Sequence, residues 1–299
     1  MECDFAGSDS WVILSPIEQS IKRKIEAVGV PLKDWDIQIN YGIKTGYNDA
    51  FIISTEKRNE ILTNCKDADE RKRTEELIRP ILRGRDIKRY GYEWANLYLI
   101  ATFPSRHYNI EKYPAVKQYL LSFGKERLEQ TGKTYTINGE KIKARKKTNN
   151  KWFETQDSIN YWEDFMRPKI IWKRIGSILR FSYDTSGHFG LDSTCFSTGQ
   201  HMAYLCCILN SFMGHYMFKD SPKTGTGDLL VSVQAIEPIS VPMNRDAEFL
   251  FEKLLNQVLE HDSKEAEKEI NRIVFQLYDL SPTEISYIID YVTQSQQSQ

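Results

Sequence analysis

The chain has 299 residues, of which 40% are hydrophobic, 12% aromatic and 27% charged, and its net charge is -1. These values are typical of a soluble globular protein of one large or two ordinary domains, and the net charge alone predicts no polyanionic partner. Five cysteines without a C-x-x-C pair argue against a disulfide scaffold. Because the N-terminus lacks a secretory signal and the most apolar run, Ala203–Leu209, is too short to span a membrane, we expect a cytoplasmic protein.

Charge is distributed unevenly along the chain. Residues 71–180 hold 25 Lys and Arg against 12 Asp and Glu, whereas residues 245–299 hold 5 against 11. A basic middle beside an acidic end is the asymmetry expected of a nucleic-acid surface next to a different module. Basic residues also solubilise any protein surface, so this pattern favours nucleic acid only if the charges share one face.

Local signals predict elements of both types in the first half of the chain. Ser15–Glu18 forms a capping box with proline at the first helical position, and the helix that follows should end at Gly29. The segment Trp35–Ile53 predicts two strands joined by a glycine-rich turn, with its last three residues buried. A charged helix is expected over Lys57–Ile78, with an interruption near 66–69.

The second half contains buried strands and then helices. Leu97–Ile100 and Ile170–Trp172 are short, apolar and β-prone, which predicts strands, and Gly199–Met213 suits a buried helix. After Pro242, apolar residues at helical spacing mark three amphipathic helices, with a second capping box at Ser281. We therefore expect an α+β body with a mixed sheet over residues 1–243 and an acidic helical tail over residues 244–299.

The sharpest local signal for a binding element is the segment Thr134–Arg145. Its Asn-Gly pair predicts a two-residue hairpin turn, because both central positions need positive φ. Strand alternation would pair Tyr135 with Ile142 on one face and place Lys141, Lys143 and Arg145 on the other. Such a ribbon fits a DNA major groove; the alternative is an edge hairpin whose lysines prevent aggregation.

Further basic and flexible segments offer contacts to phosphate. Residues 79–90 and 166–180 are rich in arginine and lysine, although Arg85 or Arg89 could instead form structural ion pairs with Asp86 or Glu93. The glycine-rich loop at 225–227, flanked by Lys219 and Lys223, could also contact phosphate. In the turn Thr45–Asn48, Asn48 could read adenine or, alternatively, bond its own backbone. Base-reading residues are more expected within residues 124–151 or 173–197.

Catalytic motifs are weak by comparison. The Lys-Thr of residues 42–46 lacks P-loop spacing, and no zinc-ligand spacing, G-x-S-x-G or G-x-G-x-x-G motif occurs. Asp86-Ile-Lys88 has the D-x-K form of metal-dependent nucleases, with Asp67 and Asp69 upstream as candidate ligands. Matches of three residues arise easily by chance in so charged a chain.

Six blocks, in order along the chain, resemble the TaqI-like C-terminal specificity domain of type IIG, Eco57I-like restriction–modification enzymes. The resemblance extends from about Trp11 to Tyr291, leaves the basic linker Thr131–Asn150 outside it, and rests on the following blocks: Gly42–Ile53, Ile78–Tyr90, Trp152–Gln156, Arg167–Trp172, Leu205–Ser211 and Ile270–Leu280.

This resemblance implies a fold similar to type I specificity subunits and a role in recognising double-stranded DNA. In the family, one long polypeptide also carries a nuclease and an adenine-N6 methyltransferase. The methyltransferase signature Asn-Pro-Pro-Tyr/Phe is absent here, so the resemblance implies a recognition region alone, without catalytic residues, metal or cofactor. S-adenosylmethionine and Mg²⁺ are expected only in catalytic domains of the same or a partner polypeptide, onto which the acidic tail could pack.

Two alternatives remain beside the DNA-recognition hypothesis: a stand-alone nuclease that uses Asp86 and Lys88, and a protein-interaction module that docks through its helical tail. For the recognition hypothesis, the predicted DNA-binding residues are Lys44, Thr45, Tyr47, Asn48, Arg83, Arg85, Lys88, Arg89, Lys141, Lys143, Arg145, Lys146, Lys147, Lys173, Arg174, Lys219 and Lys223.

Overall fold

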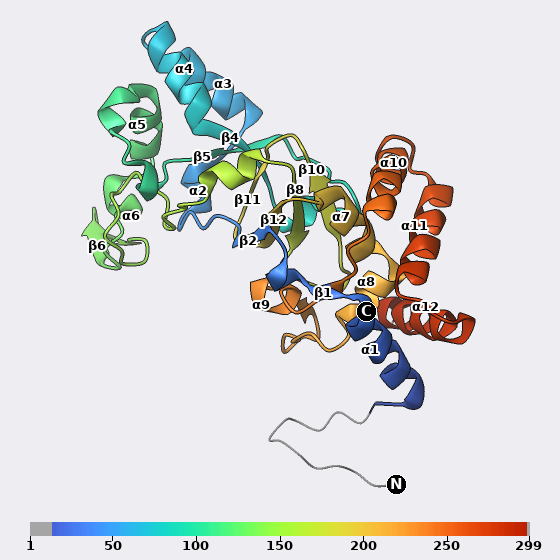
Figure 1. The fold of residues 1–299 in the computed structure, drawn as a ribbon. Coiled ribbons are helices and arrows are strands. Elements are labelled where there is room, and N and C mark those ends of the chain that lie inside the picture. The colour runs from blue at the N-terminus through green and yellow to red at the C-terminus, as the bar shows by residue number, and fades with distance from the viewer. Residues whose placement is uncertain (1–13, 298–299) are drawn as a thin grey trace.

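Two hydrophobic cores, each built on a four-stranded sheet, organise the part of the chain that this computed structural model describes, residues 14–297. The two sheets lie in the middle of the molecule (Figure 1). Helices from the first half of the chain cover one end and the C-terminal helices cover the other. The predicted α+β class with mixed sheets is confirmed.

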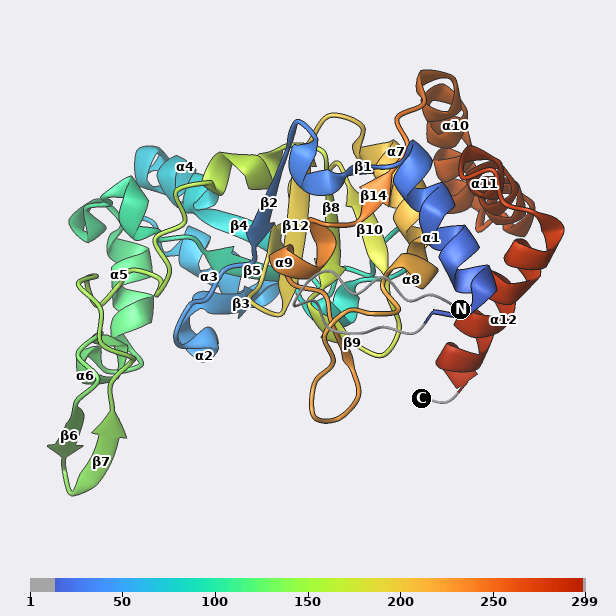
Figure 2. The same ribbon diagram turned by 60° about the horizontal axis from the view of Figure 1, so that its bottom comes forward.

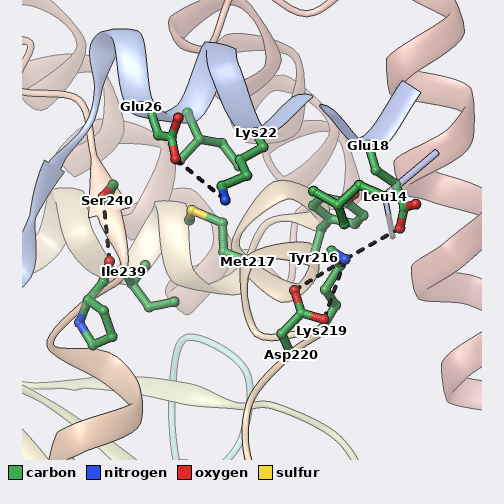
Figure 3. Close-up of a pocket in the computed structure, with 12 residues that line it drawn as sticks. Leu14, Glu18, Lys22, Glu26, Tyr216, Met217, Lys219, Asp220, Ile239 and Ser240 are labelled. Carbon is green, nitrogen blue, oxygen red and sulfur yellow. Dashed lines mark hydrogen bonds and ion pairs between the residues drawn. The ribbon is translucent and has the colours of Figure 1, made fainter. Parts of the chain in front are cut away.

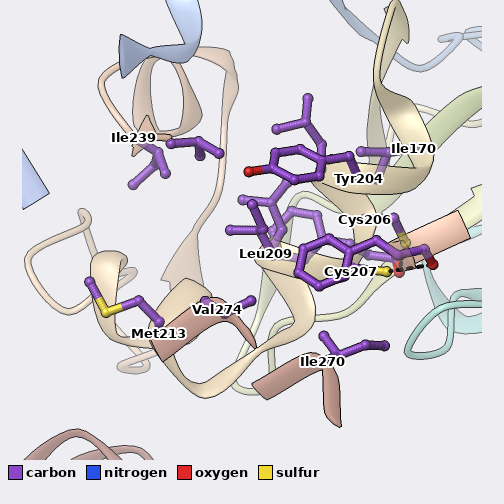
Figure 4. Close-up of a cluster of buried hydrophobic side chains, with 14 of the residues drawn as sticks. Ile170, Tyr204, Cys206, Cys207, Leu209, Met213, Ile239, Ile270 and Val274 are labelled. Carbon is purple, nitrogen blue, oxygen red and sulfur yellow. Dashed lines mark hydrogen bonds between the residues drawn. The ribbon is translucent and has the colours of Figure 1, made fainter. Parts of the chain in front are cut away.

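The first sheet is antiparallel and has the order β10-β8-β12-β2. Its strands are β2 (Ile37–Tyr41), β8 (Lys169–Lys173), β10 (Phe181–Asp184) and β12 (Thr194–Gly199). The fully buried helix α7 (Met202–Asn210) packs against it, and Figure 4 shows Tyr204, Cys207 and Leu209 of this helix among the core side chains. The predicted strand at Ile170–Trp172 is confirmed within β8.

The C-terminal helices belong to the same core. The three predicted amphipathic helices are present as α10 (Arg245–His261), α11 (Lys264–Leu277) and α12 (Pro282–Gln297). Their apolar faces pack on α7 and α8 (Phe212–Met217), and Ile270 and Val274 of α11 lie in the cluster of Figure 4. The tail thus packs on the body within this chain, while the boundary after residue 243 stays a prediction.

Helix α1 (Pro16–Val28) joins the C-terminal helices through charged contacts. Its predicted capping box is present, with Ser15 and Glu18 exchanging hydrogen bonds, and it ends before Gly29 as expected. From α12, Glu284 accepts hydrogen bonds from Ser20 at 2.7 Å and Lys24 at 2.8 Å, while also closing the second predicted capping box at Ser281. One carboxylate therefore fixes both the start of α12 and its position on α1.

The second sheet is mixed, with the order β11-β4-β5-β3 and a parallel pair between β11 and β4. Its strands are β3 (Ile52–Ser54), β4 (Ile78–Leu82), β5 (Leu97–Ile100) and β11 (Phe189–Gly190). The helices around it are α2 (Asn48–Phe51), α3 (Thr55–Thr63), α4 (Ala68–Leu77), α5 (Pro114–Leu121) and α6 (Lys125–Leu128). The break between α3 and α4 confirms the predicted interruption of the charged helix.

Short elements complete the described chain. Three two-stranded sheets pair β1 (Val30–Pro31) with β14 (Ser240–Val241), β6 (Thr134–Ile137) with β7 (Glu140–Lys143), and β9 (Ile175–Gly176) with β13 (Leu229–Leu230). The remaining short helices are α9 (Val233–Ile236) and the 3₁₀ turns η1 (Leu32–Asp34), η2 (Gly84–Asp86), η3 (Pro104–Arg106), η4 (Ile110–Lys112) and η5 (Trp162–Met166). Within residues 14–297, no helix combines the length and apolarity needed to cross a membrane.

Two sequence predictions need correction. The segment Trp35–Ile53 contains the two predicted strands, β2 and the start of β3, but a simple turn does not join them, because the short helix α2 lies in the connection and the strands belong to different sheets. The predicted helix over Gly199–Met213 divides at Ser211, whose hydroxyl accepts the backbone N–H of Gly214 and so starts α8. A change of sheet overrides the local pattern in the first segment. In the second, the contact of the Ser211 hydroxyl with the backbone overrides an otherwise continuous apolar pattern.

Candidate nucleic-acid interface

Three adjoining depressions lie where β4 and β8 end, and together we call them the basic groove. Their volumes are about 550, 450 and 210 Å³, and Asp192 lines all three. The polar residues that line the groove are Lys44, Asn48, Asp49, Arg83, Arg85, Asp157, Ser158, Asn160, Tyr161, Lys173, Arg174, Asp192, Ser193 and Tyr41. The structure thus brings together six of the predicted DNA-binding residues, from three separate segments of the chain.

A close approach of backbone to side chain holds the floor of the groove. Gly84 donates its N–H to the hydroxyl of Ser193 at 3.0 Å. A Cβ at position 84 would lie 3.0 Å from Cγ of Lys173 and 3.2 Å from Oγ of Ser193, so glycine permits this contact. The turn η2, the end of β8 and the turn before β12 are therefore held against one another, although they belong to two different sheets.

Four cations of the groove form no ion pair with the described residues. Lys44, Arg85 and Lys173 are exposed, and within the described part of the chain no carboxylate lies within 4.0 Å of their charged groups or of Arg174. The Nε atom of Arg174 is also buried without a hydrogen-bond partner there. These groups retain the charge and the donors that phosphate oxygens accept.

Arg83 differs from its neighbours because it is already paired. Its guanidinium donates to both carboxylate oxygens of Asp86, at 3.0 and 2.8 Å, and its backbone N–H adds a third bond. The side-chain hydrogen bonds that Arg83 donates to Asp86 raise the pKa of Arg83. The sequence allowed an ion pair of Arg85 or Arg89 with Asp86 or Glu93. In the structure, Asp86 pairs with Arg83 instead.

Carboxylates also line the groove. Burial raises the pKa of Asp157, and the N–H of Lys44 and the positive charges of Lys44 and Lys146 act in the opposite direction. The base of the β6–β7 hairpin lies close to the groove, because Arg145 donates to the carbonyl oxygen of Thr45 at 2.8 Å and the neighbouring Lys44 lines the groove. Sequence reasoning missed Asp157, Asp192 and Ser193 as site residues, although the last two fall within the range 173–197 expected to read bases.

The turn before α2 presents Asn48 and hides Thr45. The Thr45 hydroxyl is buried, donates to Oδ1 of Asn48 at 2.6 Å and accepts the N–H of Tyr47 at 3.1 Å. Tyr47 is half-buried, edge-on to Phe123, with Arg127 over its ring. Asn48 is exposed in the groove with its amide N–H₂ free to donate, whereas the hydroxyl of Thr45 and the ring of Tyr47 are committed to internal contacts.

The predicted hairpin is present with the expected register. Asn138 and Gly139 have φ values of 51° and 87°, and Tyr135 pairs with Ile142. Lys141 and Lys143 are exposed, opposite Thr136 and Thr134. Lys146 and Lys147, beyond the strand, are also exposed. Four lysines are therefore available on and beside this projecting arm.

Arg145 does not extend the lysine face, and that prediction is wrong. Strand pairing ends at Lys143, the chain turns inward, and Arg145 is 4% exposed. Its guanidinium donates four hydrogen bonds of 2.7–2.8 Å to the carbonyl oxygens of residues 45, 128, 152 and 154. Burial lowers its pKa to about 10. Arg145 thus anchors the arm to the turn that presents Asn48, and its donors are unavailable to DNA.

Two other predicted residues are engaged at some distance from the groove lining. Lys88 lies 3.0 Å from Glu93, as a surface ion pair. Arg89 pairs with Glu267 of α11 at 2.8 Å and donates to the carbonyl oxygen of Asn210 at 3.0 Å. Arg89 therefore links the segment between β4 and β5 of the second sheet to the C-terminal helices.

The loop after α8 contributes one free cation. Figure 3 shows Lys219 between Glu18 and Asp220 in a pocket of about 310 Å³ beside α1, with distances of 3.3 and 3.2 Å. Lys223, by contrast, is exposed. In Figure 2 this loop projects below β9 on the side toward which the hairpin also points, and α2 lies between the loop and the hairpin. Asn48 begins α2 and Arg174 directly precedes β9, so the groove lies on this side as well.

The residues of the nuclease alternative do not assemble. The carboxylate of Asp86 is held by Arg83, and Asp67 caps α4 through the N–H of Glu70. Lys88 is paired with Glu93. Throughout residues 14–297, no group of three or more His, Cys, Asp or Glu side chains is placed to hold a metal ion. The geometry therefore gives the Asp86–Lys88 motif no ligand set and supports no step through a metal.

Comparison with known proteins finds one matching family and solved structures of similar fold. The model of the family described as the TaqI-like C-terminal specificity domain matches residues 79–234. The chain is similar to the type IIL restriction-modification enzyme MmeI, solved in complex with DNA, with a TM-score of 0.55 and 11% identity over 91% of this chain and 37% of that one. The type IIG restriction endonuclease BpuSI is also similar, with a TM-score of 0.46 and 12% identity over 88% of this chain and 33% of that one. No curated protein sequence matches.

The chain thus spans little more than a third of the solved enzymes that it matches, and it shares the fold of the corresponding part of MmeI. The family match covers more than half of the chain and includes β4, β8, the hairpin and most of the groove. The chain belongs to the family of the TaqI-like C-terminal specificity domain.

Proposed function

We propose that this chain is the double-stranded DNA target-recognition part of a type IIG restriction–modification enzyme. The observation that carries this proposal is the basic groove: four cations without a carboxylate partner, drawn from segments far apart in the sequence and placed on the side toward which the lysine hairpin projects. A surface that merely solubilises the protein would not concentrate unpaired arginines and lysines in three adjoining depressions.

Affinity and specificity divide between two kinds of residue in this proposal. Lys44, Arg85, Lys173 and Arg174 bind phosphates, which hold the duplex in register but carry little sequence information. Asn48 and Ser193 line the same groove and offer directional donors and acceptors to base edges. The hairpin lysines bind the flanking backbone, and Lys223 extends the contact on the opposite side.

Methylation and cleavage are assigned to other parts of the enzyme. The chain covers 37% of MmeI, so there is room in such enzymes for large additional domains. We place the methyltransferase with S-adenosylmethionine, and the nuclease with Mg²⁺, in domains of the same or a partner polypeptide. By this proposal the chain alone recognises DNA and catalyses no reaction.

A randomised-duplex selection with the full chain tests the proposal. Bound duplexes should converge on one short motif, and anisotropy with that motif should show binding at least about 1,000-fold tighter than to an unrelated duplex at physiological salt. If the chain needs its catalytic domains for tight binding, the same selection with the rejoined polypeptide recovers the motif. Equal affinity for every duplex in both formats would refute sequence recognition.

One observation favours protein interaction as a second role. On α10 the side chain of Phe249 is 77% exposed, and Leu250 and Leu259 of the same helix are exposed as well. Exposed apolar side chains grouped on one helix are typical of contact surfaces. A Phe249→Ser variant should bind DNA normally and lose affinity for a catalytic polypeptide; retention of both activities would exclude this face from the contact.

A further inference from the structure

A second cationic cavity lies away from the basic groove, at the opposite ends of β4 and β8. Its volume is about 310 Å³, and it shares no lining residue with the groove. Arg79 is the second residue of β4 and Arg83 follows its end, a separation of about 13 Å along a strand. The residues that line this cavity are Arg73, Glu76, Leu77, Arg79, Ala101, Phe103, Arg106, Tyr108, Tyr113, Trp162, Met166 and Phe189. We call it the arginine–aromatic pocket.

The three arginines of the pocket lack acidic partners. In the described residues, no carboxylate lies within 4.0 Å of their guanidinium groups, although Glu76 lines the same cavity. Arg73 has a buried Nε without any partner, and its Nη2 donates weakly to a carbonyl oxygen at 3.3 Å. Arg79 is half-buried and donates to the thioether sulfur of Met166, a poor acceptor. Its pKa is lowered by burial.

Buried guanidinium donors without acceptors are costly, and an anion in the cavity would satisfy them. Three arginines against one glutamate leave the cavity cationic. Tyr113, which lines the cavity, is buried, and burial raises the pKa of its hydroxyl while the charges of Arg73 and Arg106 act in the opposite direction. The pocket is therefore arranged for a negatively charged group that the chain itself does not supply.

The same cavity contains a flat surface. The guanidinium carbon of Arg106 lies 4.0 Å from the ring centroid of Trp162 and 6.0 Å from that of Tyr108. At 4.0 Å the guanidinium stacks on the indole, which leaves a planar cationic face beside two tyrosines. Nucleobases stack on aromatic rings and on arginine planes of this kind.

We propose that the arginine–aromatic pocket binds a nucleoside monophosphate, with the base stacked at Arg106 and Trp162 and the phosphate held by Arg73 and Arg79. The volume is at the lower end for small-molecule sites, which suits one nucleotide and excludes a duplex. The nucleotide is either free or the 5′-phosphorylated end of a single strand. This site is separate from the duplex groove and does not depend on the function proposed for it.

Titration calorimetry on the full chain tests the site. The probes are dAMP, deoxyadenosine, inorganic phosphate, a glutamate-rich peptide, and a short single strand with and without a 5′-phosphate. We expect dAMP to bind at least about tenfold more tightly than deoxyadenosine, phosphate or the peptide, because both the stacked base and the charged hydrogen bonds contribute. A phosphorylated strand that binds better than dAMP identifies a strand end as the source, and equal binding identifies the free nucleotide.

Variants separate the pocket from the rest of the surface. Arg79→Ala and Arg106→Ala should each weaken dAMP binding about tenfold or more. Arg79→Lys, which keeps the charge, should lose less than Arg79→Ala. The matched control is Arg23→Ala, an exposed arginine of α1 that leaves dAMP binding unchanged. Because the guanidinium of Arg106 is at the surface, its removal tests the site even if Arg79→Ala fails to fold.

The outcomes distinguish this site from the duplex groove. Arg106→Ala should leave duplex binding and its salt dependence intact, and removal of the groove cations should leave dAMP binding intact. No heat from dAMP or the phosphorylated strand at about 1 mM would overturn the proposal. Equal affinity for inorganic phosphate or the glutamate-rich peptide would also overturn it, since the pocket would then not select a nucleotide.

Discussion

The salt dependence of duplex binding is the most direct test of the basic groove. The perturbation is a fourfold variant that replaces Lys44, Arg85, Lys173 and Arg174 by Gln. These residues line the groove, and none of them forms an ion pair in the described structure, so the substitutions remove positive charge without leaving an acid unpaired. The fold should persist, because three of the four side chains are exposed.

The expected magnitude follows from counterion release. Each phosphate neutralised by a cation contributes about 0.9 to the slope of log K against log salt, so loss of four contacts reduces the slope by about 3.6. If the two lines converge near 1 M salt, the variant binds about 4,000-fold more weakly than the natural chain at about 0.1 M. Fewer contacts would reduce the slope in proportion, so the measurement counts the cations that contact phosphate.

Fluorescence anisotropy with a labelled duplex of about 30 base pairs, between about 50 and 400 mM salt, measures both slopes. The matched control replaces Arg23, Lys33, Lys253 and Lys268 by Gln. These cations are exposed on α1, η1, α10 and α11, so the control loses the same net charge from elsewhere. If the control lowers the slope as much as the groove variant does, net charge and not the groove governs binding, and the reasoning from geometry is refuted.

The hairpin, Arg145 and Glu284 provide separate tests. Changing Lys141 and Lys143 to Ala should lower the salt slope by about 1.8 without changing stability; an unaltered slope removes the hairpin from the interface. Arg145→Met leaves four carbonyl groups without their donor and should lower the free energy of urea unfolding by at least about 3 kcal/mol, and a loss below about 1 kcal/mol would contradict its anchoring role. Burial acts to raise the pKa of Glu284. The hydrogen bonds that this carboxylate accepts, of which the one from Lys24 has the largest effect, outweigh burial and lower the pKa from 4.5 to about 2. Its stabilisation, at most about 3 kcal/mol, is complete above pH 4.5 and is lost as the pH falls toward 2. The difference in the free energy of urea unfolding between pH 7 and pH 3 should therefore be smaller for Glu284→Gln than for the natural chain. Equal differences would exclude this carboxylate as a source of the pH dependence.

Helix starts and the hairpin were predictable because their signals are local. The capping boxes at Ser15 and Ser281 each need only two side chains three residues apart. The turn at Asn138 needs only two adjacent residues that accept positive φ. Such contacts form within one turn of chain, so they do not depend on how the sheets pack.

Sequence periodicity failed where tertiary contacts decide. Alternation along residues 141–145 places Arg145 beside the exposed lysines, yet pairing stops at Lys143 and the guanidinium turns toward carbonyl groups from three other segments. These carbonyl groups could not be predicted from sequence spacing, because they come together only after folding. The same holds for Arg83 and Arg89, whose acidic partners could not be selected among several by spacing alone.

By itself, the sequence determined the class of fold, several helices and strands, the basic middle of the chain and its likeness to a specificity-domain family. Only the tertiary structure decided which charges share a surface. Arg85 and Lys173 line one depression, and Lys44 lines the adjoining one, because the two sheets pack with the ends of β4 and β8 together. The hydrogen bond between Gly84 and Ser193 holds this contact. Charge counts are additive along a chain, whereas a groove depends on the relative placement of distant segments, which is fixed by packing in the cores.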